Sequence, residues 1–292
     1  GHPGALLAYL TGGYASAPEL LVLDLRSRVQ LNLGLAVIDF LRWSVDGRLA
    51  FVSARENNWE IYVWDGVSIT NISNNAEEER NPAWSTDGRL AFVSTRDANY
   101  EIYVWDSGAL TNISSNPAND NSPAWSADGR LAFVSERDGR AEIYVWDGGT
   151  LTNVSQHESW DNQPAWSADG RLAFVSDRDG YPEIYVWDGV FLINFLSDFV
   201  SLHEPVWSTD GQLAFGYWYG NREVYLWDRT RLINISNDDA DDFSPTWSGN
   251  GQLAFVSQRD GNDEIYLWNG TTLTNLTQSP NTEDYAPALW TP

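Results

Sequence analysis

The chain has 292 residues, of which 42% are apolar, and its formal net charge at pH 7 is −24. The apolar fraction is enough for a hydrophobic core and excludes intrinsic disorder, while the acidic charge excludes a basic surface that binds DNA, RNA or an anionic membrane. The absence of cysteine excludes a disulfide framework, a thiol nucleophile and a thiolate zinc site. No apolar run approaches the roughly 20 residues that span a bilayer, so we expect no membrane insertion.

Internal repeats dominate the chain. Tryptophans that open a similar segment recur every 40 to 43 residues, at Trp43, Trp84, Trp125, Trp166, Trp207, Trp247 and Trp290. Each segment continues as Trp-Ser-x-Asp-Gly-Arg/Gln-Leu-Ala-Phe and then, in three of the six complete units, Val-Ser-x-Arg-Asp-Gly, before Glu-Ile-Tyr-Val-Trp-Asp and Leu-Thr-Asn-Ile-Ser in the consensus. A period of about 40 residues is typical of propellers and other repeat architectures.

One unit contains the pattern of four short strands. Pro82-Ala83-Trp84 ends the first strand, and the Asp87-Gly88 turn leads into Leu90 to Ser94. Asp-Gly between apolar runs is a strong hairpin signal, because glycine accepts the positive φ of a tight turn. The Glu-Ile-Tyr-Val-Trp and Leu-Thr-Asn-Ile-Ser segments supply the third and fourth strands. Four strands without helical periodicity predict one propeller blade.

The count of units predicts an all-β, seven-bladed propeller in a single domain, residues 1–292. Six units are complete and begin near residues 41, 82, 123, 164, 205 and 245. Residues 5–33 match the last three strands of a unit, and residues 287–292 match the first strand. We therefore expect the two termini to share one composite blade of four antiparallel strands, which closes the ring and removes exposed sheet edges.

The repeat resembles the TolB-like, tryptophan-aspartate-like propeller family, whose units carry Trp-Ser-Pro-Asp-Gly, Ser-x-Arg-Asp-Gly and Ile-Tyr. Here the proline of that pattern is replaced, for example by Val45, Thr86 and Ala127. Similar repeats occur in the propeller domains of prolyl-oligopeptidase-type peptidases. The resemblance covers nearly the whole chain and implies the fold, but it says little about function.

The same resemblance bears on where the protein works. A TolB-like propeller implies a bacterial protein of the periplasm or the cell exterior. The Gly1-His2 start is typical of a cleaved tag or an excised domain, so we expect any targeting segment to lie outside this sequence. Nothing in the residues indicates an oligomer, and a monomer is the default expectation.

Residues that recur in every blade are expected to be architectural. The repeated tryptophans should fill the space between neighbouring sheets. Five arginines each precede a glutamate by five residues, and we expect ion pairs across the hairpin. These pairs are Arg55–Glu60, Arg96–Glu101, Arg137–Glu142, Arg178–Glu183 and Arg259–Glu264.

The sequence predicts no enzyme, no cofactor and no metal site. It contains no Gly-x-Ser-x-Gly, no His-Glu-x-x-His and no phosphate-binding glycine loop. The linkers between blades are acidic, but they lack the regular spacing of a calcium loop. We expect these carboxylates to keep the protein soluble and to favour basic partners.

Several aromatic residues fall outside the repeat and in loops that should share one face. They are Trp59, Tyr100, Trp160, Tyr181 and Trp218. Exposed aromatic rings provide contact area for a protein partner or a carbohydrate at low entropic cost. The alternative is that these rings pack on neighbouring loops, and the sequence leaves both interpretations open.

The largest departures from the repeat lie in two segments that should be neighbours. Apolar residues occupy a linker that is polar elsewhere, and Gly216-Tyr217-Trp218-Tyr219-Gly220 replaces an Arg-Asp-Gly hairpin. An exposed apolar patch of this kind usually marks an interaction site, and a small local core is the alternative. The candidate residues are Phe195, Phe199, Val200, Leu202, Tyr217, Trp218 and Tyr219.

The functional expectation from these patterns is a non-catalytic recognition or scaffold propeller, part of a larger protein, that binds a protein or peptide partner. A lectin-like propeller that uses Trp59, Tyr100, Tyr181 and Trp218 is one alternative. A purely structural or engineered propeller without a ligand is the other.

Overall fold

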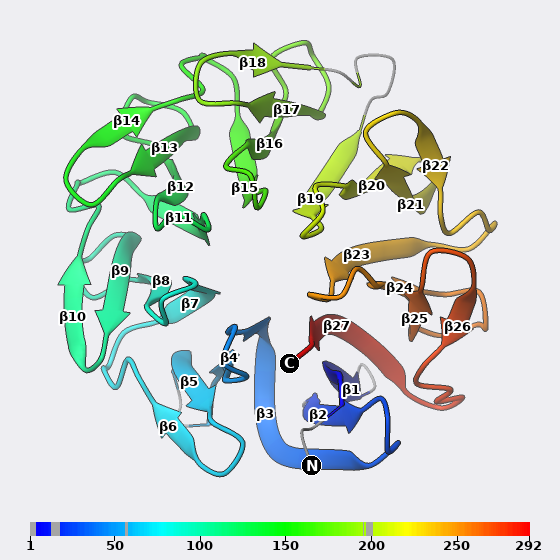
Figure 1. Ribbon diagram of the computed structural model, residues 1–292. Helices are drawn as coiled ribbons and strands as arrows, with labels where there is room; N and C mark the ends of the chain where they lie inside the picture. The colour runs from blue at the N-terminus through cyan, green and yellow to red at the C-terminus, as the bar shows by residue number, and fades with distance from the viewer. Residues whose placement is uncertain (1–3, 13–17, 56–57, 195, 197–200) are drawn as a thin grey trace.

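The protein is a closed ring of seven four-stranded blades, as a computed structural model shows (Figure 1). The structure describes residues 4–12, 18–55, 58–194, 196 and 201–292, and every regular element in these ranges is a β-strand. The predicted seven-bladed, all-β propeller is therefore confirmed.

The two ends of the chain meet in one blade, which we call the closing blade. Its strands are β27 (Glu283–Trp290), β1 (Leu6–Gly12), β2 (Glu19–Asp24) and the first part of β3 (Gln30–Trp43), in that order from the centre outward. Strand β27 pairs antiparallel with β1, with Leu6 opposite Trp290 and Leu7 opposite Leu289. The prediction of closure by both termini is confirmed.

The other six blades follow in chain order and are numbered 1 to 6. The last part of β3 is the inner strand of blade 1, so one 14-residue strand joins the closing blade to its neighbour. The inner strands of blades 2 to 6 are β7 (Glu79–Trp84), β11 (Asp120–Trp125), β15 (Asp161–Trp166), β19 (Leu202–Trp207) and β23 (Asp242–Trp247).

The remaining strands of each blade lie successively farther from the centre. The second strands are β4 (Leu49–Ser53), β8 (Leu90–Ser94), β12 (Leu131–Ser135), β16 (Leu172–Ser176), β20 (Leu213–Tyr219) and β24 (Leu253–Ser257). The third strands are β5 (Glu60–Trp64), β9 (Glu101–Asp106), β13 (Glu142–Trp146), β17 (Glu183–Trp187), β21 (Asn221–Trp227) and β25 (Glu264–Trp268). The fourth strands are β6 (Ile69–Asn71), β10 (Ala109–Asn112), β14 (Leu151–Asn153), β18 (Leu192–Ile193), β22 (Leu232–Asn234) and β26 (Leu273–Asn275).

The core is divided into seven clusters, one at each junction between blades. All five residues of the Leu-Ala-Phe-Val-Ser strands are buried, so both faces of each sheet are covered. Between blades 1 and 2, Ala50 and Val52 of one sheet meet Leu90 and Phe92 of the next. Small residues therefore face large ones, which lets the sheets pack closely. The same pattern continues around the ring, including the two junctions of the closing blade.

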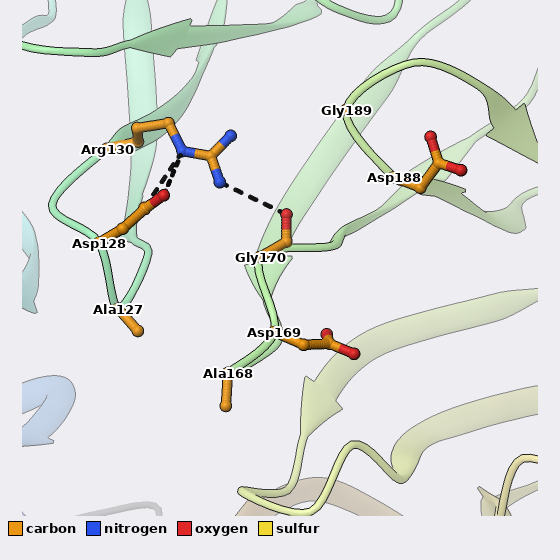
Figure 2. A pocket seen from close by; sticks show the side chains of 8 residues that line it. All are labelled: Ala127, Asp128, Arg130, Ala168, Asp169, Gly170, Asp188 and Gly189. Atoms are coloured by element: carbon orange, nitrogen blue, oxygen red, sulfur yellow. Dashed lines mark hydrogen bonds and ion pairs between the residues drawn. The ribbon is translucent and has the colours of Figure 1, made fainter.

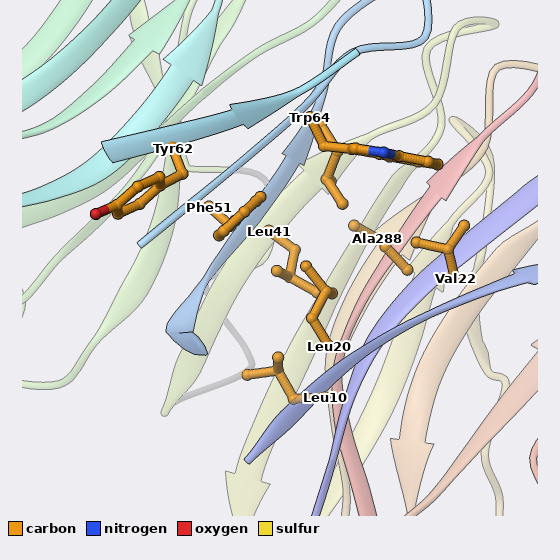
Figure 3. Packing of buried hydrophobic residues seen from close by; sticks show 10 residues of the cluster. Leu10, Leu20, Val22, Leu41, Phe51, Tyr62, Trp64 and Ala288 are labelled. Atoms are coloured by element: carbon orange, nitrogen blue, oxygen red, sulfur yellow. The ribbon is translucent and has the colours of Figure 1, made fainter. Parts of the chain in front are cut away.

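The closing junction has the largest of these clusters. Figure 3 shows Val22 and Ala288 of the closing blade packed near Trp64 of blade 1. Because this cluster joins the N-terminal, C-terminal and blade 1 strands, the hydrophobic effect holds the ring shut together with the β1–β27 ladder.

Candidate functional site

The strands define two faces of the ring, which differ in their chemistry. We call the face with the first-to-second and third-to-fourth strand turns the turn face; it carries Asp87-Gly88 and its equivalents. The opposite face, with the second-to-third strand loops and the linkers between blades, is the loop face. Antiparallel strands require this division, because successive turns fall at alternate ends of a sheet.

Buried ion pairs on the loop face join the first and second strands of four blades. The arginine donates to the carboxylate that begins the inner strand, and that carboxylate is fully buried in each case. The pairs are Arg96–Glu79 at 3.0 Å, Arg137–Asp120 at 3.2 Å, Arg178–Asp161 at 3.3 Å and Arg259–Asp242 at 3.1 Å. Each arginine also donates through Nε to the serine that ends the second strand.

The predicted pairing of these arginines with Glu101, Glu142, Glu183 and Glu264 is therefore wrong. Those glutamates accept hydrogen bonds from a different set of groups. Glu101, for example, accepts from the Ser114 hydroxyl and from the backbone N–H of Asn116. Five-residue spacing places arginine and glutamate on the same hairpin, but the arginine turns inward to the neighbouring strand. Arg55 instead lies over the ring of Tyr62.

Burial controls the ionisation of the inner carboxylates. It raises the pKa values of Glu79, Asp120 and Asp242, while hydrogen bonds from the blade's serine and arginine act in the opposite direction. A buried carboxylate of this kind is stable only when paired, so these groups serve the fold rather than solvent-accessible chemistry.

Blade 5 replaces this whole network by apolar groups. Leu202 stands where the carboxylate lies in other blades, and it is fully buried within the core between blades 4 and 5. It faces Tyr217, which replaces the serine, and Tyr219 replaces the arginine. Because carboxylate, serine and arginine are exchanged together, no buried charge is left without a partner. The alternative of a local core thus holds for Leu202, which cannot contact a partner at the surface.

The remaining described residues of this region form a small aromatic group. The Trp218 ring stacks on His203 with 4.1 Å between ring centroids, and Tyr217 lies 6.3 Å from Tyr219. Trp218 is 37% and Tyr219 69% exposed. Burial lowers the pKa of His203 below 6.5. The structure thus brings Leu202, Tyr217, Trp218 and Tyr219 together, as expected for neighbouring segments. Phe195, Phe199 and Val200 lie outside the described residues.

The other loop-face aromatics are distributed over several blades. Trp59 and Tyr100 are half-buried and pack against the core, and the Arg80 guanidinium lies 4.0 Å from the Tyr100 ring. Trp160 and Tyr181 are 49% and 59% exposed. Packing on neighbouring loops therefore describes Trp59 and Tyr100, whereas a role for Trp160 and Tyr181 in binding stays a prediction.

The closing blade has a buried carboxylate without an arginine. Asp284 on β27 is fully buried, and no arginine among the described residues forms an ion pair with it; the groups near its carboxylate are the hydroxyls of Thr11, Thr277 and Ser279. The sequence that follows Gly12 is Gly-Tyr-Ala-Ser-Ala-Pro, which contains no basic residue. Burial raises the pKa of Asp284 and the nearby Glu264 carboxylate adds to this effect, while hydrogen bonds from the Thr11, Ser279 and Thr277 hydroxyls act in the opposite direction.

The turn face carries a ladder of arginines between blades. Arg48, Arg89, Arg130 and Arg171 each donate to the aspartate two residues earlier, and each lies 4.4 to 4.6 Å from a tryptophan ring of the next blade. Figure 2 shows Arg130 between Asp128 and the Gly170 carbonyl, in a pocket of about 480 Å³. This pocket is polar and is partly filled by the protein's own guanidinium group.

A second pocket, of about 610 Å³, lies on the turn face between the closing blade and blade 1. Its wall on the closing-blade side is formed by Leu6, Val22, Val29, Leu31 and Trp290, with Asp24 and Ser27. The blade 1 side contributes Asp46, Gly47, Trp64, Asp65 and Gly66. Sequence reasoning missed this site, because its residues come from both ends of the chain and form no local motif.

The described residues contain no group of three or more histidine, aspartate or glutamate side chains arranged to hold a metal ion. They also contain no helix that is long and apolar enough to cross a membrane.

Comparisons with known proteins agree with the propeller fold. Residues 29–170 match the family model described as TolB beta propeller domain. No curated protein matches the sequence. Among solved structures, the β-propeller domain of the Trilobed protease from Pyrococcus furiosus matches with a TM-score of 0.77 and 18% identity, over 94% of this chain and 95% of that one. That domain is described as having an open velcro topology, whereas β1 and β27 close the ring here.

Two other solved structures show the range of similar proteins. The acylaminoacyl peptidase of Pyrococcus horikoshii matches with a TM-score of 0.72 and 17% identity, over 93% of this chain and 50% of that one. TolB from Acinetobacter baumannii matches with a TM-score of 0.58 and 19% identity, over 98% of this chain and 82% of that one. The chain thus spans about half the length of the acylaminoacyl peptidase, and these identities show the fold alone.

These comparisons overturn the functional expectation from the sequence. A recognition or scaffold propeller for a protein or peptide partner is wrong, because the structures with the highest TM-scores among those compared include the propeller domain of a protease and several peptidases.

Proposed function

Within the TolB-like β-propeller family, to which this chain belongs, we propose that it acts as the non-catalytic propeller of a peptidase-type hydrolase and restricts which substrates reach the active site. In this role, the catalytic groups belong to a hydrolase part outside residues 1–292. The absence of Gly-x-Ser-x-Gly from the sequence agrees with this division of labour.

The observation that carries the proposal is the match to the propeller domain of the Trilobed protease. It extends over nearly the full length of both chains with a TM-score of 0.77, compared with 0.58 for TolB. Two acylaminoacyl peptidase structures follow at 0.72 and 0.73. The peptidase propellers therefore resemble this ring more closely in shape than TolB does, which favours the peptidase role over a TolB-like one.

The hydrogen bonds between inner strands of the ring would suit a size filter for substrates, because they hold these strands in place. At two junctions, hydrogen bonds join neighbouring inner strands at bulges where the backbone has positive φ. The N–H of Glu204 donates to the Gln163 side chain at 2.7 Å, and the Glu204 carboxylate accepts from the N–H of Ser244 at 2.9 Å. Together with the β1–β27 ladder, these bonds hold inner strands around the axis in fixed positions, as a size filter at the centre of the ring would require.

The charge of the ring adds a second selection. A net charge of −24 attracts cationic peptides and repels anionic ones, and the effect weakens as salt screens it. A peptidase that carries this propeller should therefore prefer short, neutral or basic substrates at low ionic strength.

The experiment uses native material that contains this chain, captured from its source cells with an antibody against residues 1–292. Hydrolysis is measured on N-acylated peptide nitroanilides of increasing length, with the purified propeller assayed in parallel. We expect activity in the native material, none in the propeller alone, and a fall in kcat/KM of at least tenfold for a folded protein substrate relative to a short peptide. Absence of hydrolysis from the native material, at any substrate length, would overturn the proposal.

A further inference from the structure

The pocket between the closing blade and blade 1 lies at the turn-face position where, at four other junctions, an arginine side chain packs against the next blade. In four junctions an arginine reaches the Asp-Gly turn of the next blade, so that a Cβ added to the turn glycine would meet its guanidinium. The distances from this Cβ to the nearest nitrogen of that guanidinium are 2.9 Å at Gly88, 3.3 Å at Gly129, 3.2 Å at Gly170 and 3.2 Å at Gly211. At Gly47 the same Cβ would meet the Trp290 ring, at 3.0 Å.

Trp290 therefore takes the arginine's place at the closing junction. Its ring lies 6.1 Å from that of Trp43, and its Nε1 donates to the Val45 carbonyl at 3.4 Å. Blades 5 and 6 also lack the ladder arginine and carry Gln212 and Gln252 at its position. The closing junction differs in the wall beside Trp290. This wall is apolar, whereas Asp128 and Arg130 line the pocket of Figure 2.

The apolar wall is accessible to a ligand. Val29 is 66% and Leu31 46% exposed, while Trp64 forms the buried side of the pocket. Val45 and Val67, next to the lining residues of blade 1, are 65% and 94% exposed. Exposed apolar residues grouped around a pocket indicate a surface that is covered in use.

Three carboxylates line this apolar pocket, and Arg48 already pairs with one of them, Asp46, at 3.0 Å. Asp24 and Asp65 cap their turns by accepting backbone N–H groups, and these bonds lower their pKa values. Although burial opposes it, hydrogen bonds from Ser44 and Arg48 lower the pKa of Asp46. All three groups are thus charged well below neutral pH. No basic side chain is among the described residues that line the pocket, and Arg26 and Arg28 of the adjacent turn are not part of its wall.

We propose that this pocket binds an organic cation with a flat guanidinium or amidinium head and an apolar body. The head would meet Asp24 and Asp65, and the body would lie on Trp290, Val29 and Leu31. The protein itself shows the chemistry that fits, because its own guanidinium groups lie between an aspartate and a tryptophan at four other junctions. This inference does not depend on the proposed function.

The first test compares a cation with its neutral counterpart by calorimetry on the full chain at low salt. Benzamidine is paired with benzamide, and acetyl-Phe-Arg-amide with its citrulline analogue. We expect each cation to bind at least tenfold more tightly than its neutral partner. Binding of benzamidine alone would indicate a small free ligand, and tighter binding of the peptide would indicate an arginine side chain. Equal affinity for cation and neutral compound, or no binding of either cation, overturns the proposal.

Variants then locate the binding. Asp65→Asn keeps the turn, because Asn269 accepts the same backbone bonds at the equivalent position of blade 6. It should weaken benzamidine binding about tenfold with unchanged melting. Asp188→Asn, the matched change at the pocket that Arg130 fills, should leave binding unchanged. Val29→Arg would place a guanidinium at the apolar wall and should abolish binding. Equal losses in Asp65→Asn and Asp188→Asn would show attraction by net charge alone and contradict the site.

Discussion

Leu202 faces Tyr217 across β19 and β20, at the register where Asp120 faces Ser135 in blade 3. The ion pair of blade 3 and the apolar pair of blade 5 are thus two solutions for the same buried position. A buried ion pair often stabilises a protein no more than well-packed apolar groups do. A buried charge left without its partner, however, destabilises the protein strongly.

This relationship predicts how the stability of the protein changes when only one residue of the apolar set in blade 5 is replaced by its charged counterpart. Leu202→Asp places a carboxylate in the core without an arginine and should destabilise the protein by about 3–5 kcal/mol. For a chain of this size that corresponds to a loss of roughly 10 °C in melting temperature.

The triple change Leu202→Asp, Tyr217→Ser, Tyr219→Arg rebuilds the network of blade 3. It should recover most of the melting temperature lost by Leu202→Asp, as measured by calorimetry. A triple variant that melts as low as the single variant would show that the arginine does not compensate the buried carboxylate.

Asp284 should make the closing blade sensitive to pH. Its raised pKa means that the folded protein holds this proton more tightly than the unfolded chain. The free energy of unfolding therefore falls as the pH rises from the ordinary aspartate value of 3.8 through the raised value. Asp284→Asn should raise the melting temperature at pH 7, and the gain should vanish near pH 4.

A matched change separates this effect from the loss of any buried carboxylate. Asp161 lies at the corresponding end of an inner strand but pairs with Arg178 at 3.3 Å. Asp161→Asn leaves that arginine without its partner and should lower the melting temperature at pH 7. If both variants shift the melting temperature in the same direction, the missing arginine is not what distinguishes Asp284.

Trp218 should control the ionisation of His203. The stacked indole contributes to the burial that holds the pKa of His203 below 6.5, so Trp218→Ala should raise this pKa toward its ordinary value. In the wild type, the unfolded chain takes up the proton first as the pH falls through 6.5, so stability decreases there, and the variant should show a smaller decrease. NMR titration of the histidine ring resonances measures the pKa directly.

Trp160→Ala provides the control for that titration. Trp160 is similarly exposed and lies in the linker before β15, so its loss should leave the His203 titration unchanged. An ordinary pKa for His203 in the wild-type protein would contradict the stacked arrangement.

Removal of residues 287–292 should open the ring. It deletes the pairs of Leu6 with Trp290 and of Leu7 with Leu289, and it exposes the closing cluster around Ala288. We expect several kcal/mol of destabilisation and a melting temperature lower by roughly 10 °C. Deletion of Thr291 and Pro292 alone, which lie beyond β27, should have little effect. Identical melting of the longer truncation and the full chain would contradict closure by the termini.

The repeat made the fold predictable, because each blade carries the same hairpin signals and the fragments at the two ends complement each other. The ion pairs were misassigned, since spacing along one hairpin does not show which neighbouring strand a long side chain reaches. A signal was nevertheless present. A carboxylate precedes the arginine by 17 residues in four blades, as in Glu79 and Arg96, and blade 5 lacks both. The closing pocket carried no such signal, because Trp290, Val29 and Asp65 meet only through closure of the ring.

The proposed function is tested most directly with a fluorophosphonate probe, which labels the nucleophilic serine of serine hydrolases. Native material captured through residues 1–292 is treated with the probe, digested and analysed by mass spectrometry. The account predicts a labelled serine in a polypeptide segment outside residues 1–292 and no label within them. A label on a serine within these residues, or no labelled serine in the captured material, would contradict it.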